Sequence, residues 1–317
     1  MATVTSSRAA ITACLARFAV SIRADDIPPD VVTHAKRSFL HTLGLAIAGT
    51  VETAPRILGE QVRELGLKGE STIIGQAFRC DAAHAALVNG AAADIIDERD
   101  TSVGHKTPPS VTIAPTGWAV GEQTHASGAD VLAAQIVGTE VANKIGAGVK
   151  PGLQLRGWHP LAILNTFGAA ATAGRLLGLD APRMQNAFGI AAGEASGMRV
   201  AIGTMANAMG AGRSARDGIR AAILASMGFT GPMDVLEARD GFLQTFGDGV
   251  NGDPILDHLA APFGPWEPSN PPTWTDVVAK FRGNAETTMS AADVDAVVAT
   301  VERLEELDDI RTLMRLL

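Results

Sequence analysis

The chain has 317 residues, 46% of them hydrophobic, so it can bury a substantial core and form one large or two ordinary domains. Its 26 Lys and Arg stand against 34 Asp and Glu, and the net charge of -8 excludes a global basic field that would attract nucleic acid or an anionic membrane. The two cysteines, Cys14 and Cys80, are too few for a disulfide framework, which fits a reducing compartment.

The start of the chain favours a cytoplasmic protein. Its first residues lead into an amphipathic stretch with Arg8, Arg17 and Arg23, and they lack the uninterrupted apolar segment of a secretory signal. These arginines leave a mitochondrial presequence as the alternative. The longest apolar run, 39–50, is shorter than the ~18 to 20 residues that a membrane span needs, so we expect a soluble protein.

Apolar residues recur at helical spacing along the chain, whereas strand signals are scarce, since aromatic residues make up 4% and Tyr is absent. We therefore predict an all-α, mainly helical fold with one brief extended piece at 70–75. The helices expected in the first part of the chain are 7–22, 29–48, 54–65, 81–94, 110–121, 128–149, 160–177, 181–195 and 213–227.

Local sequence indicates where several of these helices begin and end. Asp26 and Asp180 each lie two residues before a proline, which is typical of an N-cap followed by a first helical turn. Gly66, Gly178 and Gly228 stand where helices should stop, because glycine accepts the left-handed C′ conformation without steric cost.

The composition changes near the C-terminus, where prolines crowd the stretch 262–272. We predict a main helical domain over 1–265 and a Pro-rich junction at 266–272, followed by 273–317. This last part should form short amphipathic helices that pack back on the main domain, because alone they would bury little surface. Their expected ranges are 273–281, 291–301 and 307–316.

One chemical segment follows the predicted helix 81–94. Asp97, Thr101 and His105 stand close together there, and a carboxylate beside a histidine can hold the imidazole in one tautomer, so this segment predicts proton transfer. The alternative is a solvated loop in which the acidic residues pair with Arg99 and Lys106.

A second segment, 156–160, also allows two interpretations. As the start of a helix, Pro160 opens the first turn, His159 caps it and Trp158 packs as an apolar staple. This interpretation leaves Arg156 beside His159, a cation suited to a carboxylate next to an acid or base.

Three further patterns favour structural interpretations. The small residues of 203–218 allow either close helix packing or backbone contact with an anion, and close packing is favoured. The stretch 247–252 spells GxGxxG, but no apolar strand precedes it and Asp248 would repel a pyrophosphate, so it predicts a turn. The seven histidines form no compact metal spacing and both cysteines are isolated, so we expect neither a metal nor a cofactor.

Taken together, these segments resemble the MmgE/PrpD family, which includes 2-methylcitrate dehydratases, cis-aconitate decarboxylases and iminodisuccinate epimerases. The resemblance implies a large all-helical domain, a smaller α+β lid inserted late in the chain, a homodimer, and a metal-free site for di- or tricarboxylates. The similar blocks cover most of the chain, at 35–44, 87–94 with the acidic segment after it, 156–160 with 167–171, and 203–205 with 211–218.

The resemblance also implies roles for individual residues. Asp97 would orient, Thr101 would form hydrogen bonds, and His105 and His159 would act as acid and base. The expected site is therefore a set of four catalytic residues, Asp97, Thr101, His105 and His159, and three that bind substrate, Arg156, Asn207 and Arg213.

The chain departs from the family pattern at two places. The family block Gly-Thr-Met-Thr-Lys-Pro-x-His is changed, so that Asn207 and Gly210 stand where a lysine and a histidine are usual, and the pocket should bind polyanions less strongly. Family members are also longer, and the difference falls after Pro268, so we expect the lid to be largely missing. Without the lid the site would stay open, so it would exclude water poorly and could not complete a closed set of catalytic residues.

These observations predict a metal-independent lyase, a dehydratase or decarboxylase, that acts on a citrate-like, methylcitrate-like or alkylcitrate-like tricarboxylate by proton transfer next to a carboxylate. We expect such a shortened member of the family to act in a specialised biosynthetic pathway rather than in central metabolism. Two alternatives remain. One is an epimerase or isomerase of a dicarboxylate, which needs no leaving group. The other is a non-catalytic family member that binds a carboxylate or a partner subunit.

Overall fold

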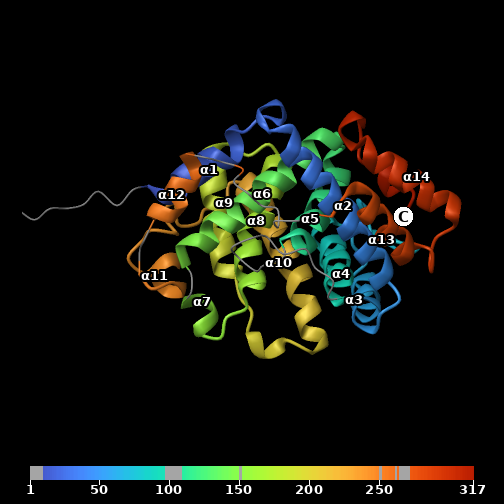
Figure 1. The fold of residues 1–317 in the computed structure, drawn as a ribbon. Coiled ribbons are helices and arrows are strands. Elements are labelled where there is room, and N and C mark those ends of the chain that lie inside the picture. The colour runs from blue at the N-terminus through green and yellow to red at the C-terminus, as the bar shows by residue number, and fades with distance from the viewer. Residues whose placement is uncertain (1–9, 97–108, 150–151, 250–251, 261–262, 264–271) are drawn as a thin grey trace, which may run out of the picture.

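The computed structural model describes residues 10–96, 109–149, 152–249, 252–260, 263 and 272–317. These residues form a mainly helical fold with one small two-stranded antiparallel sheet, which confirms the predicted fold class (Figure 1). The α-helices are α1 (Ile11–Ser21), α2 (Pro29–Gly49), α3 (Thr53–Glu64), α4 (Ala82–Ile95), α5 (Ser110–Thr124), α6 (Gly128–Val149), α7 (Gly152–Leu155), α8 (Pro160–Leu176), α9 (Ala181–Glu194), α10 (Met205–Ser226), α11 (Phe242–Phe246), α12 (Asp253–Ala260), α13 (Trp274–Ala285), α14 (Ala291–Glu302) and α15 (Arg311–Met314). The strands are β1 (Ser71–Thr72) and β2 (Arg79–Cys80), and short 3₁₀ turns are η1 (Ala24–Asp26), η2 (Arg199–Ala201) and η3 (Leu304–Glu306).

Helices α8 and α10 occupy the middle of the fold, with α1 and α12 on one side and α13 and α14 on the other (Figure 1). Helix α8 packs against both α6 and α10, and α10 also packs along α4. One apolar cluster surrounds Phe167 of α8, while a second joins Phe39 and Trp118 to Phe281 of α13. The rings of Phe39 and Trp118 meet edge to face, with centroids 5.6 Å apart.

Two glycines allow α4 and α10 to approach closely. A Cβ atom on Gly212 would lie 1.9 Å from the carbonyl oxygen of Leu87, and one on Gly90 would lie 2.8 Å from the Cα atom of Gly212. The packing interpretation of the small-residue segment is therefore confirmed at Gly212. The predicted start of this helix at 213 is wrong, because α10 begins at Met205 and the glycines lie inside it.

Most of the predicted helix ends have the expected local cause. The Asp180 side chain accepts a hydrogen bond from the backbone N–H of Arg183 at 2.9 Å, and Gly66, Gly178 and Gly228 adopt positive φ angles. Asp26 does not cap α2, since its carboxylate accepts from the N–H of Arg23 and the N-cap residue is Pro28.

The C-terminal helices lie against the first half of the chain. Helix α13 packs on α2, where a Cβ on Gly44 would lie 3.1 Å from the ring of Phe281. The N–H of Gly128 donates to the carbonyl of Leu307 at 2.8 Å, and the N–H of Ile310 donates to Ala126 at 2.9 Å. Residues 307–310, which form these bonds, are not helical, so the helix predicted at 307–316 is reduced to α15.

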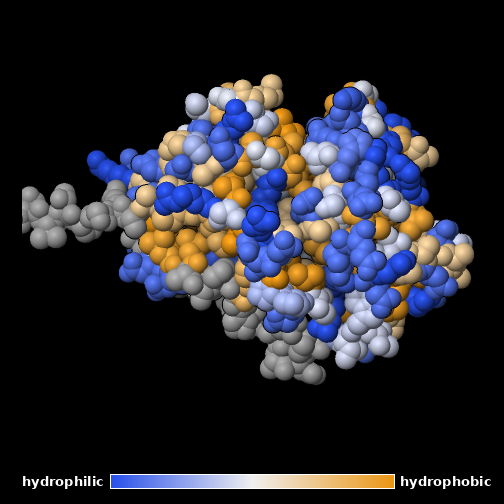
Figure 2. Space-filling view, turned by 90° about the horizontal axis from the view of Figure 1, so that it is seen from above, coloured by the Kyte–Doolittle hydropathy of each residue, from blue (hydrophilic) through white to orange (hydrophobic). Residues whose placement is uncertain are grey.

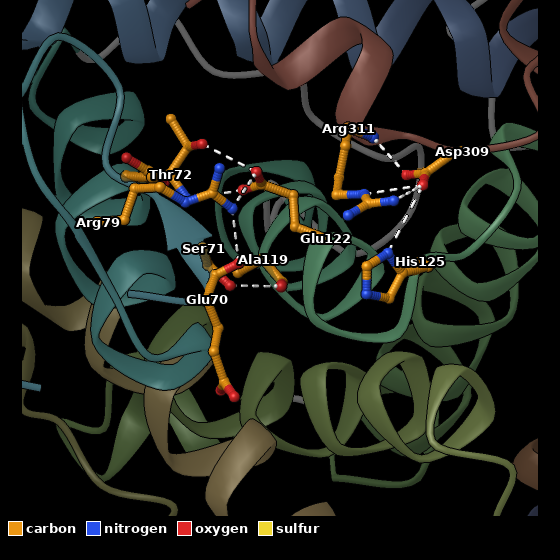
Figure 3. A network of polar contacts seen from close by, with 10 residues as sticks. Glu70, Ser71, Thr72, Arg79, Ala119, Glu122, His125, Asp309 and Arg311 are labelled. Carbon is orange, nitrogen blue, oxygen red and sulfur yellow. Dashed lines mark hydrogen bonds and ion pairs between the residues drawn. The ribbon is translucent and has the colours of Figure 1, made fainter. Parts of the chain in front are cut away.

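A cluster of polar and charged side chains joins the end of α5 to the hairpin β1–β2 (Figure 3). It consists of Thr72, Arg79 and Glu122, and we call it the α5-end cluster. Glu122 has only 1% of its side chain exposed, and its carboxylate accepts from the Thr72 N–H at 2.6 Å, the Thr72 hydroxyl at 2.9 Å and Arg79 Nη2 at 2.9 Å. Burial raises the pKa of Glu122 above its ordinary value, while these hydrogen bonds and the Arg79 charge act in the opposite direction.

A second ion pair lies beside this cluster in Figure 3. Arg311 Nε donates to Asp309 Oδ2 at 2.8 Å, and His125 Nδ1 lies 3.7 Å from the same carboxylate. The hydrogen bond from Arg311 lowers the pKa of Asp309 to about 2. The contact between His125 and Asp309 therefore connects the C-terminal segment to the end of α5.

The surface is mixed in polarity. Seen from above, hydrophilic residues dominate the right-hand part of the face, and hydrophobic residues form patches at its centre and left (Figure 2). None of the helices within the described residues combines the length and the apolarity that crossing a membrane requires.

Candidate functional site

A pocket of about 160 Å³ lies where α8 and α10 begin, and it brings together His159, Asn207 and Arg213. All three were predicted as site residues from the sequence. In Figure 1 the segment between α9 and α10 runs along the lower edge of the molecule and forms part of this region. We call it the site pocket, and its lining residues are His159, Ala162, Gly197, Met198, Ala201, Ala206, Asn207, Met209, Gly210 and Arg213.

His159 is placed by backbone pairing across the pocket. It is the N-cap residue of α8, with Pro160 at the first helical position, but its side chain forms no capping hydrogen bond. Its N–H donates to the carbonyl of Gly197 at 3.0 Å, and the N–H of Arg199 donates to Gly157 at 2.9 Å. This bridge fixes the backbone of His159 and leaves its imidazole on the pocket wall.

Trp158 anchors the same turn from the other side. It forms the isolated antiparallel bridge with Met198, and its ring meets that of Phe246 edge to face at 5.1 Å. The predicted apolar packing of Trp158 is therefore present.

Gly197 separates His159 from Arg213. Its φ angle is +143°, and a Cβ there would lie 2.6 Å from the Cβ of Ala162 and 3.2 Å from Arg213 Nη2. A larger residue would push these neighbours apart, so glycine keeps the imidazole and the guanidinium in one pocket.

Arg213 supplies a permanent positive charge to the pocket wall. Its Nη1 donates to the Ser196 hydroxyl at 2.7 Å, and its Nη2 donates to the Ser196 carbonyl. Burial lowers the pKa of Arg213, although the nearby charge of Asp217 raises it, and an arginine remains protonated in proteins. A guanidinium has five N–H donors, so the two atoms held by Ser196 leave capacity for a bound anion.

Asn207 lies between the pocket and a buried acid. Its Nδ2 donates to Oδ2 of Asp94 at 3.4 Å, and Asp94 is buried near the end of α4. Among the described residues, the buried Oδ1 of Asn207 has no hydrogen-bond partner. The amide therefore retains unused hydrogen-bonding capacity beside His159 and Arg213.

Two helix ends add to the positive character of the pocket. The first turns of α8 and α10 border it, neither contains an acidic residue, and no described residue of the pocket lining is acidic. Helix N-termini carry partial positive charge and unpaired N–H groups. Together with Arg213 they favour a carboxylate ligand.

Arg156 lies apart from this pocket. Its guanidinium donates to the carbonyl of Gly247 and pairs with Asp248 at 3.1 Å, on side chains that are both exposed. The arginine predicted to anchor a substrate carboxylate thus binds a carboxylate of its own chain. The same contacts hold the predicted turn, in which Gly249 has a φ of +129°.

The predicted residues Asp97, Thr101 and His105 lie outside the described residues and stay predictions. In the part of the chain that the structure describes, no group of three His, Cys, Asp or Glu side chains is arranged to hold a metal ion.

Several lining residues were not predicted from the sequence, among them Gly197, Met198 and Met209. No sequence signal brings Met198 beside His159, because the bridge between their segments is a long-range pairing. Asp94 stands at the end of the predicted helix 81–94, and the structure gives it Asn207 as a partner.

The fold and the pocket define a helical protein with a small site that contains an arginine, a histidine and an asparagine. A family model described as MmgE/PrpD N-terminal domain matches residues 13–253. The chain belongs to the MmgE/PrpD family, which confirms the resemblance seen in its motifs.

Curated relatives carry the names of decarboxylases. The chain is 30% identical over 239 residues to a human (Homo sapiens) cis-aconitate decarboxylase, covering 73% of this chain and 49% of that protein. It is 30% identical over 188 residues to an Aspergillus terreus cis-aconitate decarboxylase, covering 57% and 38%. It is 27% identical over 177 residues to the cis-aconitate decarboxylase-like protein oryM of Aspergillus oryzae, covering 53% and 37%. The matched region spans half or less of each relative.

Proposed function

We propose that the chain is a lyase that removes carbon dioxide or water from a citrate-like, methylcitrate-like or alkylcitrate-like tricarboxylate. The observation that carries this proposal is the meeting of His159, Asn207 and Arg213 in one pocket at two helix starts. The names of the relatives, cis-aconitate decarboxylases, favour loss of carbon dioxide.

Arg213 would bind a substrate carboxylate. Its guanidinium is held from behind by Ser196, so its position is set before the ligand arrives and little side-chain entropy is lost on binding. The N-terminal turns of α8 and α10 would stabilise the same negative charge. Asn207 would accept a hydrogen bond from a substrate hydroxyl group through Oδ1, or donate one to a carboxylate from the second N–H of Nδ2.

His159 would move the proton. In a decarboxylation the bond between carbon and the leaving carboxylate breaks, its electron pair stays on carbon, and the imidazolium delivers a proton there. In a dehydration the neutral imidazole removes the proton next to a carboxylate while the C–O bond breaks and the hydroxyl leaves as water. Both routes develop negative charge beside a carboxylate, which Arg213 and the helix ends would stabilise.

Purified protein incubated separately with cis-aconitate, citrate, 2-methylcitrate and a longer alkylcitrate tests this function. We expect carbon dioxide release, or an alkene absorbance, with at least one of these acids. Turnover should be lost in His159→Ala and retained in Arg220→Gln, a control on α10 outside the pocket lining, whose arginine pairs with Glu194.

Two other results would contradict the lyase. Exchange of substrate hydrogen for solvent deuterium without loss of mass would indicate an epimerase. Tight binding of an acid with no chemical change would indicate a non-catalytic member of the family.

A further inference from the structure

Apolar side chains gather at the mouth of the site pocket. Twelve large hydrophobic residues are exposed in the described part of the chain, and five of them fall within 198–209. Two of these five, Met198 and Met209, line the pocket beside its polar residues. We call Met198, Met205 and Met209 the methionine rim.

Two of the three methionines, Met198 and Met209, line the pocket itself. Met205 extends this apolar rim by one helical turn, because it lies four residues before Met209 on the same face of α10. Met198 belongs to the segment before α10 and is held by its bridge to Trp158. Met198 is 64% exposed and Met205 is 53% exposed, so no packed core in the described chain requires either side chain.

The pocket therefore combines two chemistries. Its inner wall carries Arg213, His159 and Asn207, whereas its mouth is lined by flexible thioether side chains that adapt to irregular apolar shapes. Among the described residues that line the pocket, Arg213 is the one permanent cation, and Asn207 carries no charge. A ligand that matches both parts has a carboxylate head and an aliphatic substituent.

We propose that the substrate of this site carries an alkyl chain, which lies along the methionine rim while a carboxylate meets Arg213. The proposal rests on the proposed function, since it concerns the same pocket, and it selects an alkylcitrate-like acid over citrate. The alkyl chain takes the place of water on the three methionines, so affinity depends on its length.

Calorimetric titration with methyl-, propyl- and hexylsuccinate tests this proposal. These diacids share the carboxylate head but carry neither a hydroxyl group nor a double bond, so a lyase does not consume them. We expect affinity to rise about two- to fourfold for each added methylene group, as for apolar surface leaving water.

Substitution of the rim should remove this dependence on chain length. In the double variant Met198→Gln, Met205→Gln we expect methylsuccinate to bind as before and hexylsuccinate to gain little over it. Both positions are exposed, so the fold should persist. The matched control is Met227→Gln, at the opposite end of α10 and 78% exposed, which should retain the full dependence.

The possible results distinguish a failure of the methionine rim from a failure of the carboxylate site at Arg213. Equal affinity for all three succinates, with binding abolished in Arg213→Gln, would overturn the rim and leave the proposed function standing. No binding of these succinates or of any citrate would contradict the carboxylate site itself, and the rim with it. Sedimentation of the wild type and the double variant tests whether a second copy of the chain covers the rim. If the wild type is a dimer, the double variant is a monomer, and the length of the alkyl chain has no effect on affinity, the proposal is wrong.

Discussion

The site pocket and the α5-end cluster both place charged groups in the protein interior, but they use them differently. Glu122 has both carboxylate oxygens engaged by Thr72 and Arg79, and its side chain is only 1% exposed, so it is closed to a ligand. In the pocket, the buried amide oxygen of Asn207 has no hydrogen-bond partner among the described residues, and Arg213 donates hydrogen bonds to Ser196 from two of its nitrogens. A fully satisfied polar cluster stabilises the fold, whereas an incompletely satisfied one can bind.

Helix α10 shows the same contrast on its two sides. Gly212 presses against the backbone of α4, while Gly210 faces the pocket, where the nearest atom to an added Cβ is that of Ala162 at 3.8 Å. The packed side fixes the position of the helix, and the open side offers space.

Substitution of these two glycines by alanine should change the free energy of unfolding in opposite directions. Gly212→Ala should lower the free energy of unfolding by about 3 kcal/mol, because the new methyl group would meet the Leu87 carbonyl and force α4 and α10 apart. Gly210→Ala should raise it by about 0.5–1 kcal/mol, since alanine favours the helix. Urea unfolding measures both, and equal effects would show that the close approach of the helices is unimportant.

The second expected effect compares the two polar regions directly. Glu122→Ala leaves the N–H of Thr72 and the Arg79 guanidinium without their acceptor, and we expect it to cost about 2–3 kcal/mol of stability. Asn207→Ala removes a single long hydrogen bond to Asp94, so its cost should stay below about 1 kcal/mol. Thermal and urea unfolding of both variants check this order, and a reversed order would show that the α5-end cluster does not stabilise the fold more than Asn207 does.

The smallest expected effect is a change in pH dependence at the C-terminal ion pair. Because Arg311 depresses the pKa of Asp309 to about 2, from an ordinary value of 3.8, the folded state binds this proton less readily than the unfolded state. The pair thus stabilises the fold above about pH 4, and this contribution is lost as the pH falls from there towards 2.

Asp309→Asn should therefore be less stable than the wild type near neutral pH, and the difference should shrink as the pH falls below about 4. Unfolding curves recorded across this range test the sign. A difference that grows on acidification would show that Arg311 does not stabilise the ionised carboxylate.

Long helices with clear ends were predictable from the sequence. Helix α6 has both of its predicted ends, at Gly128 and Val149, and α9 starts at Ala181 as its aspartate cap indicates. Helix α10 was predicted to start too late, because glycines normally disfavour helix and only its tertiary contact with α4 explains Gly212 inside it. Helices α11 and α12 were missed, since five and eight residues are too short for a periodic pattern.

The site was predictable in its residue types and less so in its geometry. The turn at Pro160 placed His159 at a helix start, and family similarity pointed to Asn207 and Arg213. The partners of these residues come from elsewhere in the chain: Ser196 and Gly197 reach the pocket through a long-range bridge, and Arg156 is drawn to Asp248. Such pairings depend on the tertiary fold, which local sequence patterns do not specify.

We propose that a carboxylic acid reacts in the site pocket, and separate measurement of kcat and KM for His159→Ala tests this, using whichever tricarboxylate the wild type consumes. We expect kcat to fall about 10²–10⁴-fold, the usual contribution of a general acid or base, with KM changed little and the fold intact by circular dichroism. A folded His159→Ala variant with the wild-type kcat would contradict this proposal.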